Sequence, residues 1–321
     1  MSSSSEKPFL IHNTEIAPGQ HDVVRIPVGR LPSGNLMTIR AHVFRSTQPG
    51  PVLLAVAGIH GDEVNGVEIL RRAITQGLFE NLACGSVIAI PILNVYGFIN
   101  FSREVPDGKD VNRSFPGNMN GSLASRVARI LSKKILPYAG LAVDFHTGGN
   151  GTFNYPQIRF SQGDEAAEKM ARIFGAPFLV TKPLIPKSFR KAAADQGKIA
   201  LVFEGGENLR YDAFTIEKGL AGLHRLLFAQ GMLTKEPAPP DKCMLFRKST
   251  WVRAPRAGMF LWRKCSGNKA NKGEVLGVIN DPYGEWEVPV AAPRDGYLIG
   301  HNNAPVVSQG DALFHIGWEW E

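Results

Sequence analysis

The sequence predicts a layered α/β domain with a largely parallel or mixed sheet, followed by a small all-β region. Between about residues 51 and 230, apolar runs alternate with segments whose apolar residues recur at helical spacing. After a Pro-rich stretch near residues 235–242, short β-like pieces are separated by Gly, Pro and Asn. We therefore expect two domains, at residues 1–235 and 243–321.

The elements follow one another in a regular order. The first 50 residues are strand-rich and are expected to supply edge strands. "PVLLAVAGI" then predicts a buried strand, and "VNGVEILRRAI" an amphipathic helix. "SVIAIPIL" predicts the next strand, a long loop follows, and "SLASRVARILSKKIL" predicts a helix with Ser122 as its N-cap. "LAVDFH", "APFLV" and "KIALVFE" predict further core strands, with helices at "DEAAEKMARIF" and "IEKGLAGLHRLLFAQ".

Composition and charge narrow the class of protein. The net charge of +7 comes from scattered basic residues without a block, which argues against nucleic-acid binding. No apolar run reaches the roughly 20 residues that span a bilayer, and the N-terminus lacks the pattern of a secretory signal. Cys84, Cys243 and Cys265 show no metal-binding or disulfide spacing. We expect a cytoplasmic protein without a membrane partner; a homo-oligomer is left open.

Polar residues follow three of the predicted strands. His60 and Glu63 lie where the first core strand gives way to a helix, His146 ends "LAVDFH", and Glu204 ends "KIALVFE". Because ligand sites of such sheets lie beyond the carboxyl ends of the strands, these residues indicate a site. Two histidines and one glutamate are a known catalytic zinc ligand set, and neighbouring glycines would let a substrate approach. The alternative is that His60 caps the helix and His146 is a core histidine.

Three further features suit a hydrolytic site. Asp144 lies two residues before His146, so its side chain points the same way and could orient a ligand histidine. Glu204 ends a buried apolar strand, where a carboxylate is either paired or suited to act as a general base. The loop "NVYGFINFSREVPDGKDVNRSFPG" carries Arg103, Asp110, Asn112 and Arg113, and its guanidinium and amide groups suit a carboxylate receptor or an ordinary charged surface loop.

Four motifs in order, "AGIHGDEVNG", "DVNRSFPG", "DFHTGG" and "VFEGGE", followed by a β-rich tail, resemble the succinylglutamate desuccinylase/aspartoacylase family. That family belongs to the zinc carboxypeptidase-like hydrolases. The resemblance covers essentially the whole chain. It implies a zinc-carboxypeptidase-like α/β/α domain with a mixed central sheet, and a C-terminal all-β domain similar to the barrel-sandwich fold of carrier domains.

The resemblance also implies roles for seven residues. His60, Glu63 and His146 would bind one zinc per chain, and Glu204 would activate the zinc-bound water. Arg103 would polarise the scissile carbonyl, and Asn112 with Arg113 would hold a substrate carboxylate. The function implied is a deacylase, an amidohydrolase that cleaves the linear amide bond of a small N-acyl amino acid. A peptide-cleaving zinc carboxypeptidase and a non-enzymatic metal-binding or carrier protein are the alternatives.

Two departures from the family's pattern limit this interpretation. Aspartoacylases carry a basic residue shortly before the general base that contacts a second substrate carboxylate. Here Arg190 and Lys191 lie further upstream, so a second carboxylate is left open. The turn "DPYGEWE" lacks the lysine that carrier domains modify, so we expect the tail to be unmodified and to shape the active-site entrance.

Overall fold

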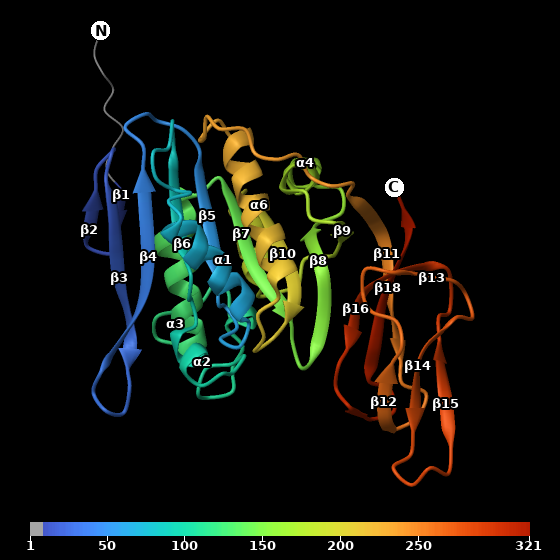
Figure 1. The fold of residues 1–321 in the computed structure, drawn as a ribbon. Coiled ribbons are helices and arrows are strands. Elements are labelled where there is room, and N and C mark those ends of the chain that lie inside the picture. The colour runs from blue at the N-terminus through green and yellow to red at the C-terminus, as the bar shows by residue number, and fades with distance from the viewer. Residues whose placement is uncertain (1–8) are drawn as a thin grey trace.

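The computed structural model describes residues 9–321 and shows a mixed α/β fold built on one long sheet (Figure 1). Within these residues the sheet has 12 strands. From one edge to the other they are β13 (Lys269–Ala270), β16 (Gly296–Asn302), β18 (Ala312–Trp320), β11 (Met244–Arg253), β9 (Phe178–Thr181), β8 (Thr152–Phe160), β10 (Ile199–Glu207), β7 (Leu141–Gly148), β5 (Val52–Ala57), β6 (Ser86–Ile90), β4 (Leu36–Arg45) and β3 (His21–Arg30).

Strand direction explains how distant parts of the sequence meet. Strands β6, β5, β7 and β10 are mutually parallel neighbours, whereas β4 and β8 run antiparallel to β6 and β10. The predicted mixed sheet is therefore confirmed, and the first 50 residues supply one edge of the sheet as expected, with β3 at the edge and β4 beside it. Because β5, β7 and β10 are parallel, their carboxyl ends lie along the same side of the sheet. The polar residues of the motifs lie at these strand ends.

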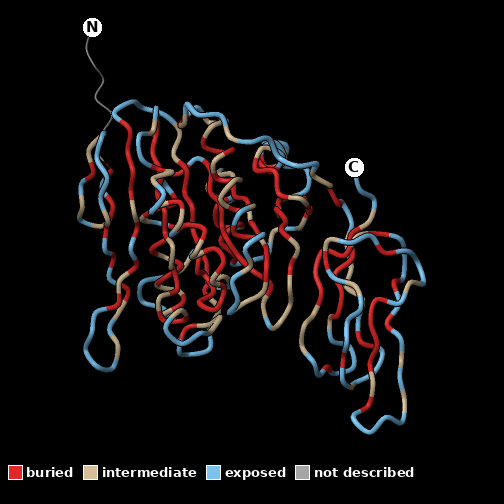
Figure 2. Tube along the Cα trace, in the orientation of Figure 1, coloured by how far each residue is buried: buried red, intermediate tan, exposed pale blue. Residues whose placement is uncertain are grey.

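Helices cover both faces of the sheet. On one face, α1 (Val64–Thr75), α4 (Glu165–Phe174) and α6 (Ala213–Ala229) bury apolar side chains such as Leu70, Phe174 and Leu223 in a shared core. On the other face lie α3 (Leu123–Ile130), η2 (Leu131–Ile135), α5 (Phe189–Ala194) and the short hairpin of β1 (Phe9–Ile11) and β2 (Thr14–Ile16). Buried residues accordingly concentrate along the sheet and beneath the helices (Figure 2).

The predicted cap of α3 is confirmed: Ser122 accepts a hydrogen bond from the backbone N–H of Ser125. Helix α6 begins at Ala213, before the predicted start at Ile216, because Asp212 caps it by accepting from the N–H of Thr215. Three shorter helical segments complete this part of the chain: α2 (Val95–Ile99), η1 (Val111–Arg113) and η3 (Leu136–Tyr138). Within residues 9–321, none of the helices combines the length and the apolarity needed to cross a membrane.

The chain beyond the Pro-rich stretch is all-β, as the sequence predicts. A second sheet has the order β15 (Glu287–Ala291), β14 (Val275–Asn280), β12 (Gly258–Trp262) and β17 (Val306–Val307). Side chains of this sheet, such as Phe260 and Leu276, pack with Leu298 of β16 and Phe314 of β18 in a separate apolar core. The sequence did not predict that β11 would pair with β9 and β16 with β8, so that backbone hydrogen bonding continues into the main sheet. The two-domain division and the barrel-sandwich likeness stay predictions.

Candidate metal centre and active site

His60 and Glu63 lie in the short turn between β5 and α1. Glu63 occupies the N-cap position of α1, but no side chain caps this helix. The alternative in which His60 serves as a helix cap is therefore wrong. The turn packs closely against α2, and a Cβ at Gly61 would lie 1.9 Å from the backbone of Gly97. Gly61 therefore makes room for the backbone of α2 and not for a substrate, contrary to the role expected for it.

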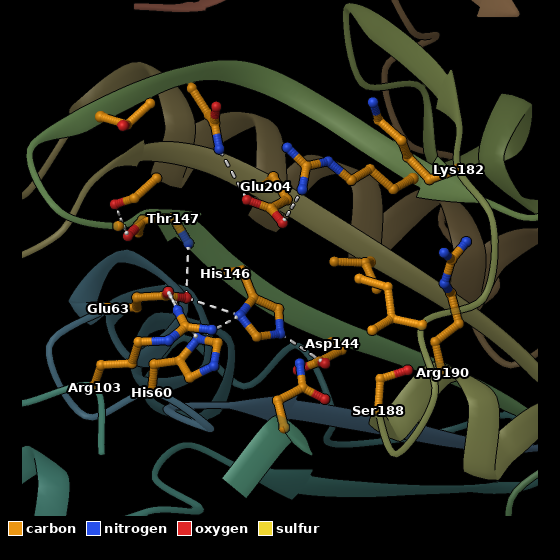
Figure 3. Close-up of a pocket in the computed structure, with 18 of the residues that line it drawn as sticks. His60, Glu63, Arg103, Asp144, His146, Thr147, Lys182, Ser188, Arg190 and Glu204 are labelled. Carbon is orange, nitrogen blue, oxygen red and sulfur yellow. Dashed lines mark hydrogen bonds and ion pairs between the residues drawn. The ribbon is translucent and has the colours of Figure 1, made fainter. Parts of the chain in front are cut away.

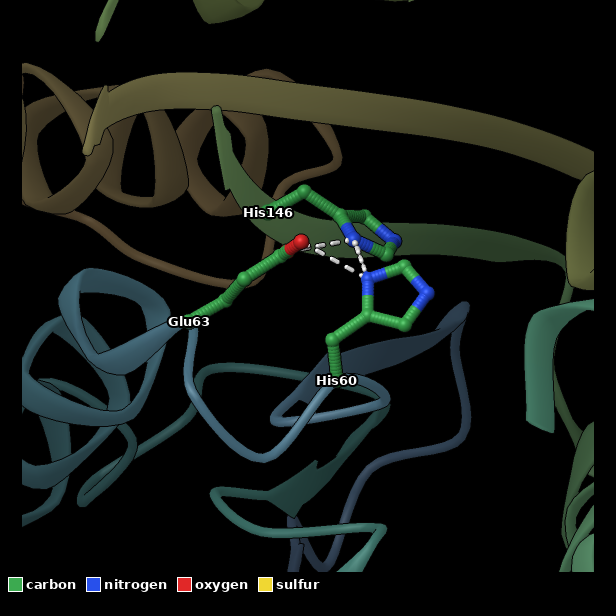
Figure 4. A group of neighbouring side chains, drawn as sticks. All are labelled: His60, Glu63 and His146. Carbon is green, nitrogen blue, oxygen red and sulfur yellow. Dashed lines mark hydrogen bonds and ion pairs between the residues drawn. The ribbon is translucent and has the colours of Figure 1, made fainter. Parts of the chain in front are cut away.

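The side chains of His60, Glu63 and His146 converge on one point (Figure 4). Glu63 Oε1 lies 2.8 Å from His60 Nδ1, and Glu63 Oε2 lies 2.8 Å from His146 Nδ1. The two Nδ1 atoms are 3.2 Å apart, and one ligand atom from each residue lies within 4.8 Å of the others. Two imidazole nitrogens and a carboxylate oxygen in one buried cluster fit a zinc site that keeps an open position.

Buried partners hold this triad in place. His146 Nε2 lies 2.8 Å from Asp144 Oδ2, and both residues are buried within β7. A hydrogen bond from Nε2–H to the carboxylate leaves the lone pair of Nδ1 facing the triad, which is how ligand histidines are commonly oriented. Glu63 Oε2 also accepts a hydrogen bond of 3.1 Å from the backbone N–H of Thr147. The interaction expected between Asp144 and His146 is present.

The electrostatics of the cluster favour positive charge. Burial by itself raises the pKa of Glu63, but His60 and His146 outweigh it and hold that pKa well below its usual value. Burial by itself lowers the pKa of His146, but Asp144 and Glu63 raise that pKa well above its usual value. The carboxylates thus stabilise a cation at this position, whether it is a proton on a ring nitrogen or a divalent metal.

Arg103 reaches the triad from the loop after α2. Its Nη1 lies 3.1 Å from His60 Nδ1 and 3.4 Å from Glu63 Oε1, and its Nη2 donates a hydrogen bond of 2.9 Å to Asp110 Oδ2. Burial by itself raises the pKa of Asp110, but His60 and Arg103 lower it by more, so the net shift of this pKa is downward. Asp110 therefore positions Arg103 beside the cluster.

Asn112 and Arg113 form the short segment η1 at the rim of the site. Asp110 caps this segment by accepting a hydrogen bond of 2.6 Å from the Asn112 N–H. The Asn112 side-chain oxygen accepts a hydrogen bond of 2.8 Å from the Phe189 N–H, so the amide offers the cavity its N–H donors. Arg113 is exposed and donates to the Asn112 carbonyl at 2.7 Å. Asp110 pairs with Arg103, and among residues 9–321 it forms no ion pair with Arg113.

Glu204 lies on β10, beside His146 on the neighbouring parallel strand. Its two oxygens accept hydrogen bonds from different residues: Arg159 Nη1 at 2.6 Å and Asn154 Nδ2 at 2.9 Å. The carboxylate is thus paired, which is the first of the two expectations for a glutamate at the end of a buried strand, and a role for Glu204 as general base stays a proposal. Both partners come from β8, which runs antiparallel to β10.

One cavity of about 410 Å³ contains the whole constellation (Figure 3). It is lined by all seven residues that the sequence predicted for the site: His60, Glu63, Arg103, Asn112, Arg113, His146 and Glu204. The triad lies at one side of this cavity, and Lys182 and Arg190 lie at the other (Figure 3). A volume of this size accommodates a small molecule rather than a folded partner.

Several residues of the cavity wall were not assigned to the site from the sequence, among them Asn154, Arg159, Lys182, Arg190 and Trp251. Arg159 is the one charged residue of the largely buried strand β8, and such a charge is the signal that could have revealed it. Lys182 lies in the loop after β9 and Arg190 lies in the short helix α5. Neither segment has a periodic pattern from which its position could be predicted. Trp251 comes from β11, beyond the Pro-rich stretch, so the C-terminal strands contribute to the cavity wall.

Comparison with known proteins defines the family. The model for the succinylglutamate desuccinylase/aspartoacylase catalytic domain matches residues 49–229, more than half of the chain. The chain belongs to this family. An N-alpha-acetyl-L-2,4-diaminobutyric acid deacetylase from Halomonas elongata is 26% identical over 311 residues, which cover 92% of this chain and 90% of the relative.

Solved structures show the same fold over nearly the full length. A succinylglutamate desuccinylase/aspartoacylase from Rhodobacter sphaeroides is 27% identical, with a TM-score of 0.83 and coverage of 94% of this chain and 95% of that one. The product-bound ectoine utilization protein EutE from Ruegeria pomeroyi is 25% identical, with a TM-score of 0.86 and coverage of 97% and 99%. The likeness therefore includes the C-terminal strands as well as the matched catalytic region.

Proposed function

We propose that this protein is a zinc-dependent deacylase that hydrolyses the amide bond of a small N-acyl amino acid. The observation that carries the proposal is the convergence of a His–Glu–His triad, Glu204, Arg103, Asn112 and Arg113 on one cavity. Membership of the family supports the same reaction class, and the related deacetylase from Halomonas elongata acts, by its name, on an N-acetylated amino acid.

His60, Glu63 and His146 are the residues that would hold the zinc. When bound there, zinc would supply a Lewis acid for the scissile carbonyl and lower the pKa of a coordinated water. Asp144 keeps His146 in the tautomer whose Nδ1 faces the triad. The donor set fits the metal, since nitrogen and carboxylate oxygen ligands are common in catalytic zinc sites.

The chain's own groups account for the remaining steps. Glu204 is held by Arg159 and Asn154 and would accept a proton from the attacking water, then pass it to the leaving amine. Arg103, fixed by Asp110, presents an N–H donor beside the triad, where negative charge develops on the substrate carbonyl oxygen. Asn112 and Arg113 offer N–H donors at the rim, in the position for the α-carboxylate of the amino acid.

The C-terminal region is proposed to be a second domain, residues 243–321, that shapes the cavity rather than carrying a modified lysine. Trp251 of β11 lines the cavity, which supports this role. The intact mass of protein from its native host should equal that of the bare sequence. An added biotinyl or lipoyl mass would contradict the proposal and favour a carrier protein.

A hydrolysis screen tests the function directly. The zinc-loaded protein is incubated with N-acetyl, N-formyl and N-succinyl amino acids, and with dipeptides, and the released amine is quantified. We expect turnover of N-acyl amino acids and little of peptides, because the cavity is small. Peptide hydrolysis at a higher kcat/KM would instead identify a carboxypeptidase. Absence of turnover on every substrate would favour a non-enzymatic role.

A further inference from the structure

Two residues of β8 hold Glu204, and different parts of the molecule support them. Arg159 Nη1 donates to one carboxylate oxygen of Glu204 and Asn154 Nδ2 donates to the other, so the carboxylate is held from both sides (Figure 3). In the described chain, β9 pairs with β8 over residues 157–160, which include Arg159. Asn154 lies before that stretch. The two donors therefore depend on different neighbouring strands.

The strand that reaches Asn154 is β16, which comes from beyond the Pro-rich stretch. It runs antiparallel to residues 152–154 of β8, and Gly300 lies directly opposite Asn154. On its other side this end of β8 pairs with β10. A segment whose backbone is hydrogen-bonded on both sides frays less than a free edge does. The C-terminal region thus fixes the backbone of a residue that holds Glu204.

Gly300 also makes room for the side chain of Asn154. A Cβ at Gly300 would lie 2.7 Å from Asn154 Oδ1 and 3.1 Å from the backbone oxygen of Phe153. The φ angle of Gly300 is not in the left-handed region, so the backbone conformation does not require a glycine here. A glycine within a strand commonly marks a place where another group approaches closely. At Gly300 that group is the Asn154 amide.

The orientation of the Asn154 amide follows from its partner. An ionised carboxylate accepts hydrogen bonds and donates none, so Nδ2 faces Glu204 and Oδ1 faces Gly300. Asn154 is 4% exposed, which leaves its side chain little space to turn. A group that displaces Oδ1 would therefore displace the donor to Glu204 as well.

We propose that β16 positions the general base, with Gly300 and Asn154 as the positioning residues. The inference rests on the proposed deacylase function, in which Glu204 takes a proton from the attacking water. A carboxylate has about four lone-pair sites, so two donors restrain its rotation and still leave each oxygen a site for the proton. Small misplacements of a reacting group cost rate, which makes this restraint valuable. The C-terminal region then acts on the rate as well as on the shape of the cavity.

Steady-state kinetics of two variants test the proposal, with the N-acyl amino acid that the wild type hydrolyses fastest. Gly300→Ala should push the Asn154 amide away from Glu204, and Asn154→Ser removes the donor. Each variant should lower kcat roughly tenfold or more, because a hydrogen bond to a charged group is lost. KM should change less than about twofold, because the lost contact is not one to the substrate.

Two kinetic results would overturn the proposal. An unchanged kcat in Asn154→Ser would show that Glu204 does not need this donor. A raised KM with an unchanged kcat would make Asn154 a substrate-binding residue instead. Asn154→Ser carries the test even where Gly300→Ala does not fold, and circular dichroism establishes the folding of each variant.

A double variant and a control distinguish positioning from a general weakening of the C-terminal region. Because Gly300 acts through Asn154, adding Gly300→Ala to Asn154→Ser should change kcat less than about twofold further. Asn303→Ser is the matched control, because Asn303 follows β16 and donates a hydrogen bond of 2.8 Å to Glu207, which lies outside the cavity wall. This control should keep the wild-type kcat. Additive effects in the double variant, or an equal loss in Asn303→Ser, would contradict the proposal.

Crystal structures of the variants separate this inference from the proposed function. In Gly300→Ala the distance from Asn154 Nδ2 to Glu204 Oε2 should be too long for a hydrogen bond, while Arg159 keeps its bond. That result supports the link from β16 to Glu204 even if the wild type hydrolyses no amide, which would overturn the deacylase alone. An intact bond between Asn154 and Glu204 in Gly300→Ala, or a loss of kcat in Glu204→Gln but not in Asn154→Ser, would overturn the positioning alone.

Discussion

The two walls of the cavity differ in how their charges are balanced. On the triad wall each charged group has an opposite partner: Arg103 meets Asp110, and His146 lies between Asp144 and Glu63. The opposite wall, here called the charged wall, holds Lys182 and Arg190, which have no carboxylate partner within residues 9–321. Paired charges fix the geometry of the triad wall without a substrate, as a catalytic centre requires. The charged wall leaves positive charge facing the cavity, which favours an anionic substrate.

The largest expected effect concerns Glu204, which lies between the two walls. Glu204→Gln keeps the shape and can still hydrogen-bond to Arg159 but cannot accept a proton. Turnover should fall by roughly 10²–10⁴, with zinc content retained. Glu207→Gln is the matched control, because Glu207 lies three residues further along and bonds to Asn303 rather than lining the cavity. Near-normal turnover in Glu204→Gln would show that another group deprotonates the water.

Asp144 tests whether the triad wall depends on its buried partners. Asp144→Asn replaces a charged acceptor for His146 by a neutral one. Zinc affinity, measured by competition with a chelator, should fall roughly 10- to 100-fold. The melting temperature of the metal-free protein is measured alongside, so that a change in folding is distinguished. Unchanged affinity would mean that His146 needs no orienting partner or does not bind the metal.

Arg113 tests the receptor assigned to the α-carboxylate. Arg113→Lys keeps the charge but loses the planar pair of donors, so kcat/KM should fall about tenfold while the fold and zinc content are kept. Conversion of the substrate's α-carboxylate to an amide should cost the wild type a similar factor and cost the variant little. Equal hydrolysis of acid and amide by the wild type would rule out the carboxylate role of Arg113.

The sequence predicted the triad wall much better than the charged wall, for physical reasons. His60, Glu63, His146 and Glu204 lie at the ends of apolar runs that predict central strands, and parallel strands bring their carboxyl ends together. The predicted α/β class, the edge strands and the Ser122 cap depend on local patterns of the same kind, and they are confirmed.

The charged wall depends on pairing that local patterns do not encode. Arg159 meets Glu204 because β8 turns back antiparallel to β10, and Lys182 meets Ser249 and His315 because β11 joins β9. Arg190 was noted upstream of Glu204 in the sequence, but the short helix α5 that carries it was not predicted. Lys191, its neighbour, instead pairs with Asp195 on the surface. Contacts between distant segments are fixed by topology, so the sequence left the second carboxylate open.

The central claim is that His60, Glu63 and His146 bind a catalytic zinc, and zinc analysis of the wild type and of His146→Ala tests it most directly. We expect one zinc per chain in the wild type. His146→Ala should lose both the zinc and the amide hydrolysis, with circular dichroism showing an intact sheet. Full zinc occupancy in His146→Ala, or undiminished hydrolysis by metal-free wild type, would contradict the claim.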